Sequence, residues 1–551
     1  MTMIKKLRTI LAALSRGEKI IVLLAGIVLL VSSAFLLSLL WQNITYAIPG
    51  RGGAYREGMV GQPSYVNPVL ATSETDKSLI RLIFSSVDDL AEKIEPLEEG
   101  RKWRVRLRAD ARWQDNTPLT SDDIIFTVSQ IQNPNNISPL RQGWQGVSLE
   151  RVSGTEVIFK LGIPYAFFPQ MLHELFVVPR HLFQDIPLAN WRISDLNLRP
   201  IGSGPYAFDK IEIAKDGFIK SYTLKASENY WGDPPLITQI SFRFFKTYAH
   251  AIAAFNKGEV DGIGGIPAHL LSDLQRTYQL AQFQTQTYYA VFLNSTQNLA
   301  LKDDSVRKAL DLLVDRKNLI NTALSSYGSP VTGPFPTFHF APSSADNAAD
   351  PIALLEEAGW QRNEEGARAK TIKDTSIPLS FTLTVPDLPF LVTTASQLKA
   401  AWSKAGIAVQ LEVLPLQEVL EKKIKDRSYE AILFGNNLST GEDIFSFWHS
   451  SQKFYPGLNL ALYESTKADE LIETIRQTLD AKNRRSLEEE LAALITSHTP
   501  AIFLYAPSYL FVADKQVKGI EAARLPAPED RLRQLPRWYL YTKRELKPPA
   551  S

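Results

Sequence analysis

An uninterrupted apolar stretch lies near the start of the chain, where residues 20–40 carry no charged side chain. A helix of this length spans the hydrocarbon core of a bilayer. Basic residues precede it at Lys5, Lys6, Arg8, Arg16 and Lys19. Basic residues that flank a membrane helix stay on the cytoplasmic side, so residues 1–19 are predicted to be cytoplasmic. Residues 20–41 are predicted to form a single-pass anchor in the cytoplasmic membrane, with the rest of the chain outside. Residues 41–48 lack a small-residue cleavage pattern, so a retained anchor is favoured over a cleaved signal peptide.

Residues 42–53 contain several glycines and are predicted to form a tether. Beyond them, two kinds of hydrophobic pattern alternate along the chain. Period-two alternation predicts strands, and apolar positions spaced three and four apart predict helices. Predicted strands are 102–107, 157–161, 237–245, 288–294, 379–385, 408–414 and 501–505. Predicted helices are 121–131, 248–257, 305–313, 350–358, 393–404 and two successive amphipathic stretches within 467–497. Strands and helices in this order are typical of an α/β fold in which helices cover sheets.

Composition narrows the class of protein. The 551 residues are 45% hydrophobic, enough for two or three lobes. With 60 basic and 59 acidic residues the net charge is +1, which gives no electrostatic footprint for nucleic acid. The chain has no cysteine, which excludes disulfides, thiolate metal sites and lipid attachment through cysteine. Attachment to a membrane, if present, is therefore by the apolar helix.

Motifs for catalysis or cofactor binding fail when they are tested. Ser203 lacks the flanking glycines of a hydrolase elbow. A dinucleotide fingerprint from Gly262 would need glycine where Pro267 stands. The seven histidines are scattered, and acidic pairs such as Asp122 and Asp123 precede helical runs, where they stabilise the helix start. The sequence therefore predicts no catalytic residue, no metal site and no cofactor.

From Arg112 the sequence reads RWQDNTPLTSDDIIF, which resembles the W-x-D-G-x-P-x-T-x-x-D-V segment of the peptide/nickel family of extracytoplasmic solute-binding proteins, family 5. Asn116 stands where the family has Gly, and Asn is a residue that tolerates the positive φ of a turn. The matching positions are Trp113, Asp115, Pro118, Thr120 and Asp123.

More segments resemble the family in the family's own order over about 450 residues. They are RPIGSGPY at 199–206, ENYWGDPP at 228–235, NKGEVDG at 256–262, the strand and helix of 291–320, and LLEEAGW at 354–360. The resemblance implies the type II periplasmic-binding-protein fold, two lobes that close by hinge motion around a ligand. The first lobe is expected at 54–270 and 500–545, with a subdomain at about 80–195, and the second at 271–499. Crossings between the lobes are expected near 265–285 and 495–508.

The resemblance further implies a monomeric carrier, not an enzyme, that delivers peptides, in particular oligopeptides, to the permease subunits and ATPases of an ABC importer. Backbone hydrogen bonds would hold the peptide as an added strand. Ligand contacts are expected from the loop at 64–68 and from the stretch at 434–445, with a tryptophan just beyond. The candidates are Tyr65, Val66, Asn67, Gly435, Asn436, Asn437, Leu438, Ser439, Glu442, Asp443 and Trp448.

The second stretch departs from the family pattern. Peptide-binding relatives place an Asp there for the ligand's amino terminus, and this chain has Asn437, Leu438 and Ser439. Glu442 and Asp443 follow closely and are candidate substitutes. Three other functions stay open: carriage of a non-peptide solute such as a nickel chelate, a membrane-tethered sensor or envelope scaffold that kept the fold, and an extracytoplasmic hydrolase.

Overall fold

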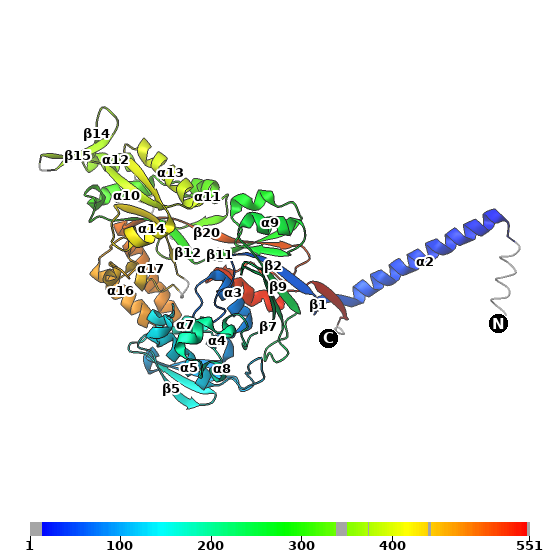
Figure 1. The fold of residues 1–551 in the computed structure, drawn as a ribbon. Helices are drawn as coiled ribbons and strands as arrows, with labels where there is room; N and C mark the ends of the chain where they lie inside the picture. Colours follow the sequence, from blue (N-terminus) through cyan, green and yellow to red (C-terminus); the bar gives the residue numbers. More distant parts are fainter. Residues whose placement is uncertain (1–13, 338–349, 373, 439–441, 548–551) are drawn as a thin grey trace. The chain divides into compact units, whose positions relative to one another are not determined.

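A computed structural model of the chain describes residues 14–337, 350–372, 374–438 and 442–547. The chain forms two compact units, one made of residues 1–53 with 539–551 and the other of residues 54–538. The larger unit contains the predicted α/β fold (Figure 1).

The smaller unit consists of a long helix and a two-stranded sheet. Helix α2 (Arg16–Ile44) begins at a capping box between Ser15 and Glu18, none of its residues is buried, and it is long and apolar enough to cross a membrane. Strand β1 (Thr45–Gly50) pairs antiparallel with β22 (Tyr541–Leu546). Within residues 42–53, where a tether is predicted, 42–44 are the end of α2 and 45–50 are β1.

A 13-stranded sheet organises residues 54–538, in the order β18-β17-β19-β12-β20-β10-β2-β9-β8-β7, with β11, β13 and β21 joined at its side. The strands of one half are β2 (Ala54–Val60), β7 (Tyr206–Ile213), β8 (Ile219–Ala226), β9 (Gln239–Phe245) and β10 (Gly262–Gly264). Those of the other half are β12 (Thr287–Leu293), β17 (Ser380–Pro386), β18 (Ala408–Leu414) and β19 (Ala431–Asn437). The rest are β11 (Tyr278–Thr285), β13 (Gly328–Pro330), β20 (Ala501–Asp514) and β21 (Arg524–Leu525).

We call the half that contains β2 and β7–β10 the first lobe, together with a four-stranded sheet of order β3-β4-β6-β5. That smaller sheet lies within the subdomain expected from the sequence, and its strands are β3 (Ala91–Leu97), β4 (Lys102–Leu107), β5 (Ser148–Ser153) and β6 (Glu156–Lys160). The half that contains β12 and β17–β19 is the second lobe. It also carries a small sheet of β14 (Gln361–Arg362), β15 (Arg368–Ile372) and β16 (Thr375–Pro378).

Strand β20 belongs to both lobes. Its first residues pair with β12, and its residues from Ser508 to Asp514 pair with β11. The sequence predicted a strand only over 501–505, whereas β20 has 14 residues. The strand is longer because its second half finds new partners in the first lobe, and most of its residues are buried.

The helices lie close to their predicted positions. Helix α13 begins at Pro389, four residues before the predicted start, because proline is well suited to the first turn of a helix. The first-lobe helices are α3 (Glu74–Ile83), α4 (Val87–Leu90), α5 (Ser121–Gln132), α6 (Arg141–Trp144), α7 (Phe168–His173), α8 (Arg180–Phe183), α9 (Tyr248–Asn256) and the 3-10 helix η10 (Pro528–Arg537). The second-lobe helices are α10 (Asp304–Leu312), α11 (Arg316–Ala323), α12 (Pro351–Glu357), α13 (Pro389–Lys404), α14 (Leu416–Glu418), α15 (Phe445–Trp448), α16 (Thr466–Gln477) and α17 (Ala481–His498).

Helices cover both faces of the second-lobe sheet, as the alternating side chains of β12 show. Val291 and Leu293 belong to a core with α10–α13, and Ala290 and Phe292 belong to a core with α15–α17. The two groups of helices stand apart on either side of β12 in Figure 1. Phe167 of the first lobe is also buried in the second of these cores. The lobes are therefore in direct contact at this residue.

Candidate functional site: a cavity between the lobes

A cavity of about 370 Å³ lies where the two lobes face each other. Its wall is built from the segment around α7 in the first lobe, the connection between β11 and β12, the loop after β19, the first turns of α17, and one proline before η10. The lining residues are Phe167, Gln170, His173, Glu174, Gln286, Glu442, Ala481, Arg484, Arg485, Glu488 and Pro526. A pocket of this size, made by both lobes, is suited to enclose a small ligand or part of a larger one.

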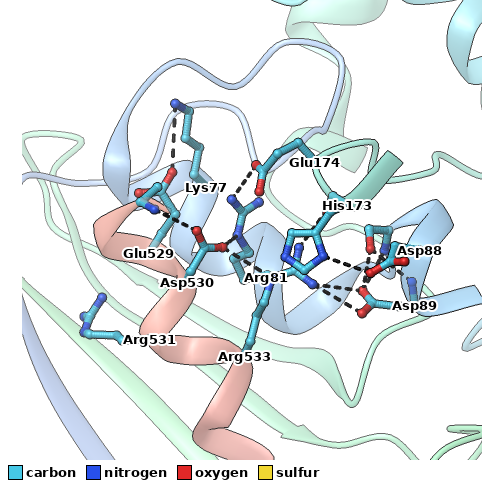
Figure 2. A network of polar contacts seen from close by, with 12 residues as sticks. Lys77, Arg81, Asp88, Asp89, His173, Glu174, Glu529, Asp530, Arg531 and Arg533 are labelled. Atoms are coloured by element: carbon cyan, nitrogen blue, oxygen red, sulfur yellow. Dashed lines mark hydrogen bonds and ion pairs between the residues drawn. The ribbon is translucent and has the colours of Figure 1, made fainter. Parts of the chain in front are cut away.

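On the first-lobe side, a network of ion pairs fixes the end of α7 (Figure 2). The buried guanidinium of Arg81 donates to Glu174 Oε2 at 2.6 Å and to Asp530 Oδ1 at 2.7 Å. Arg533 of η10 donates to the carbonyl of His173 at 2.7 Å. These bonds hold Glu174 at the cavity wall, because α3 and η10 provide the donors.

Burial raises the pKa of the Glu174 carboxyl, and the Arg81 guanidinium opposes that rise. His173 contacts Asp88 at 3.0 Å through Nδ1, and this hydrogen bond lowers the pKa of Asp88. The ligand atoms of His173, Glu174 and Asp530 lie within 4.8 Å of one another, a distance that would suit a metal ion. Arg81 and Arg533 already bond these carboxylates, so the cluster is a salt-bridge network and carries no argument for a metal.

On the second-lobe side, α17 presents charged residues to the cavity. Arg484 Nη1 donates to the carbonyls of Thr478 and Leu479, and its guanidinium covers the ring of Phe167 at 5.3 Å. Arg485 Nε donates to Glu489 at 2.9 Å. Both guanidiniums are thus engaged by groups of the protein.

Glu488 is the most unusual ionisable group of this wall. Its side chain is only 7% exposed, it lies 3.8 Å from Arg484 Nε, and no hydrogen bond to it occurs within the described chain. Burial, and secondly the charge of Glu442, raise the pKa of Glu488 to about 7. A negative charge on Glu488 is therefore costly in this environment.

Several acceptors of the cavity lack a donor. Gln170 Oε1, Glu174 Oε1 and Gln286 Oε1 are buried and have no hydrogen-bond partner among the residues that the structure describes. Glu442, in the left-handed backbone region with φ of 68°, also makes no hydrogen bond or ion pair to another described residue. An unpaired buried acceptor costs about 1–3 kcal/mol. The cavity therefore has unused capacity to accept hydrogen bonds.

Among the residues predicted from the sequence to contact a ligand, Glu442 lines this cavity. Asp443 does not, because its carboxylate accepts hydrogen bonds from Tyr165 Oη at 2.8 Å and Arg476 Nε at 3.1 Å. Ser439 lies outside the described residues. A direct role for Glu442 and Asp443 in ligand binding stays a prediction.

The remaining second-lobe candidates surround the end of β19. Asn436 Nδ2 and Trp448 Nε1 both donate to the buried hydroxyl of Tyr288, at 3.0 and 3.2 Å. Leu438 is fully buried. Gly435 lies opposite Tyr289 across the strand pair, and the exposed Asn437 lies opposite Thr287. These contacts position the strand end beside Gln286, where the cavity begins.

The first-lobe candidates lie elsewhere. Val66 and Asn67 are buried, and Asn67 Nδ2 donates to Asn197 Oδ1 at 3.1 Å. Tyr65 is partly exposed beneath the guanidinium of Arg192, at 5.4 Å. None of the three lines the 370 Å³ cavity, and contact between this loop and a ligand stays a prediction.

Sequence reasoning missed Gln170, Glu174, Gln286, Arg484 and Glu488. On α17 the available signal was the spacing of Arg484 and Glu488 by four residues, which is equally typical of an exposed ion pair. Only the tertiary fold turns that face of the helix toward the first lobe.

Two lobes that share β20 and enclose a cavity define a solute-binding protein of the two-lobed, type II class. The sequence of residues 86–455 matches the middle region of the bacterial extracellular solute-binding proteins of family 5. The chain belongs to this family, whose members are binding proteins for transport and not enzymes.

Known relatives cover nearly the whole chain. The oligopeptide-binding protein AppA of Bacillus subtilis (strain 168) is 25% identical over 530 residues, which are 89% of this chain and 92% of AppA. The solved structure of AppA with a nonapeptide has a TM-score of 0.67 and 23% identity, covering 90% of this chain and 100% of that one. NikZ of Campylobacter jejuni in complex with Ni(L-His) has a TM-score of 0.69 and 23% identity, covering 88% and 99%. Both structural likenesses concern the fold.

Proposed function

We propose that the chain captures peptides, in particular oligopeptides, outside the cytoplasm and delivers them to the permease and ATPases of an ABC importer. The observation that carries the proposal is the cavity between the lobes, in which the Oε1 atoms of Gln170, Glu174 and Gln286 lack a hydrogen-bond partner among the described residues. Peptide N–H groups are donors of the kind that these acceptors lack. Similarity to the oligopeptide-binding protein AppA supports a peptide ligand.

Opening and closing of the lobes would load and release the ligand. The lobes are joined by β20 and by the connection between β11 and β12, at few residues. Ligand bonds made by both walls favour the closed arrangement only, and this differential affinity shifts the population toward closure. The protein itself performs no chemistry on the ligand.

Helix α2 supports attachment to the cytoplasmic membrane as a single-pass anchor, because it exposes apolar side chains along its length. Retention of the helix would keep the binding protein near its permease. Extraction of native membranes with alkaline carbonate tests the anchor. A retained helix leaves the full-length chain in the membrane pellet, and recovery of a shortened chain in the supernatant would exclude it.

Native mass spectrometry of the full-length chain, released from detergent micelles, tests the ligand class. A family of co-purified peptide masses supports oligopeptide capture. A single non-peptide mass, such as a nickel chelate, would replace the peptide by another solute. Absence of any bound mass, together with no heat of binding to a diverse peptide library, would contradict transport and favour the sensor or scaffold.

A further inference from the structure

We infer that the cavity between the lobes selects a ligand that places a positively charged, N–H-rich nitrogen group against Glu442 and Glu488. This inference rests on the proposed function and names the chemistry of its ligand. It follows from which polar groups of the wall are already bonded and which are not.

The basic groups of the wall are already bonded to the protein. Arg484 donates to two carbonyls and stacks on Phe167, and Arg485 is paired with Glu489. His173 is bonded to Asp88. An anionic ligand would have to compete with these partners, so the basic side chains of the wall would contribute little to its binding.

The groups with unused capacity are acceptors, and they come from both lobes. Glu174 and Gln170 present buried oxygens from the first lobe, and Gln286 presents one from the crossing. Glu442 and Glu488 add carboxylates from the second lobe. A cation placed between them satisfies acceptors on both walls, so it contributes to closure as well as to affinity.

Glu488 supplies the second argument, because it is buried without a hydrogen bond from any described residue, and the guanidinium of Arg484 approaches it only to 3.8 Å. The nearby charge of Glu442 makes its ionisation harder still. A bound cation offsets the repulsion between these two carboxylates, whereas a neutral ligand leaves it in place. The wall is therefore complementary to positive charge and not to hydrogen-bond donors alone.

Two parts of a peptide carry such a group: a basic side chain and the free amino terminus. Isothermal titration calorimetry of the full-length chain in detergent distinguishes them with four peptides of equal length. Each contains either arginine or its neutral isostere citrulline at one internal position, and each has either a free or an acetylated amino terminus. A preference of at least about tenfold for the peptide that carries the charge is expected.

Matched variants locate the effect. Glu442→Gln and Glu488→Gln keep the side-chain volume and remove the charge, and each is expected to abolish most of the preference for the cationic peptide. Glu490→Gln is the control, because Glu490 lies on the same helix but pairs with Lys467 away from the cavity. It is expected to keep the full preference. Circular dichroism confirms that all three variants fold.

The outcomes separate the two proposals. Loss of preference on removal of the arginine charge assigns the group to a side chain, and loss on acetylation assigns it to the amino terminus. Equal affinity for all four peptides would overturn the inference and leave peptide capture intact. Absence of binding to all four, and to a diverse library, would overturn both.

Discussion

The hydroxyl of Tyr165 donates to Asp443 Oδ2 at 2.8 Å although the two residues are 278 positions apart in the chain. Arg476 donates to the same carboxylate oxygen, and its own carbonyl accepts from the backbone N–H of Ala166 at 2.6 Å. The bonds from Tyr165 and Ala166 join the first lobe to the second beside the cavity, and the Arg476–Asp443 bond ties their two partners together. Asp443, a candidate ligand contact in the sequence, is thus part of an interlobe contact.

Replacement Tyr165→Phe removes this bond while keeping the ring. One hydrogen bond to a charged group contributes about 1.5–3 kcal/mol, so the closed arrangement loses stability and ligand affinity is expected to fall roughly tenfold. Calorimetry with a peptide recovered from the purified chain measures the change. Tyr455→Phe, at an exposed position of the second lobe, serves as the control. An unchanged affinity for Tyr165→Phe would show that this contact does not contribute to closure.

Glu488 makes the stability of the ligand-free protein depend on pH. Its pKa rises from an ordinary 4.5 to about 7 on folding, so the folded state holds the proton more tightly than the unfolded state. The contribution of Glu488 to the stability of the folded protein is therefore fully present below pH 4.5 and is lost as the pH rises through 7. Because one pKa unit corresponds to about 1.4 kcal/mol, Glu488→Gln is expected to stabilise the protein by up to about 3 kcal/mol at pH 8.

Thermal unfolding of both proteins between pH 5 and pH 8 measures this effect. The two melting temperatures should diverge as pH rises, with the variant the more stable. A difference that stays constant over the range would show that Glu488 is ionised at all these pH values.

Arg81 joins three segments of the first lobe, because its buried side chain bonds Glu174 and Asp530. Arg81→Lys keeps the charge but cannot reach both carboxylates with one compact ammonium. A partly unpaired buried carboxylate is expected to cost about 3 kcal/mol and to lower the melting temperature. Lys77→Ala is the control, since Lys77 is half exposed and 3.9 Å from Glu529. Equal melting temperatures for the two variants would contradict a structural role of the network.

Tyr288→Phe tests the polar cluster at the end of β19. The buried hydroxyl of Tyr288 accepts from Asn436 and Trp448, and both donors would be left without a partner. The free energy of unfolding is expected to fall by about 2–4 kcal/mol. Chemical denaturation measures it, and a cost under about 0.5 kcal/mol would mean that these donors find other partners.

The sequence predicted the class of fold, the family and the longest helices, because periodic apolar positions and turn motifs are local signals. It predicted β20 only in part, since the second half of β20 pairs with β11, whose residues lie more than 200 positions earlier in the chain. It did not predict that β1 pairs with β22, because the two strands lie far apart in the chain.

The site was less accessible to sequence reasoning than the fold. Glu442 was singled out and lines the cavity, but its neighbour Asp443 points to Tyr165. Adjacent side chains therefore lie in different environments, and only the tertiary fold determines which of them faces the cavity. Glu174 and Glu488 line the same cavity because the two lobes bring the end of α7 and the start of α17 together.

The central place of β20 also bears on the order in which the chain can mature. This strand comes from residues 501–514, yet it fills the middle of the large sheet, between β12 and β10. Until residues 501–514 have been synthesised, the sheets of both lobes keep an open edge where β20 belongs. A nascent chain built in this way stays incompletely folded until β20 has been synthesised, and a polypeptide in that condition can be threaded through a secretion channel.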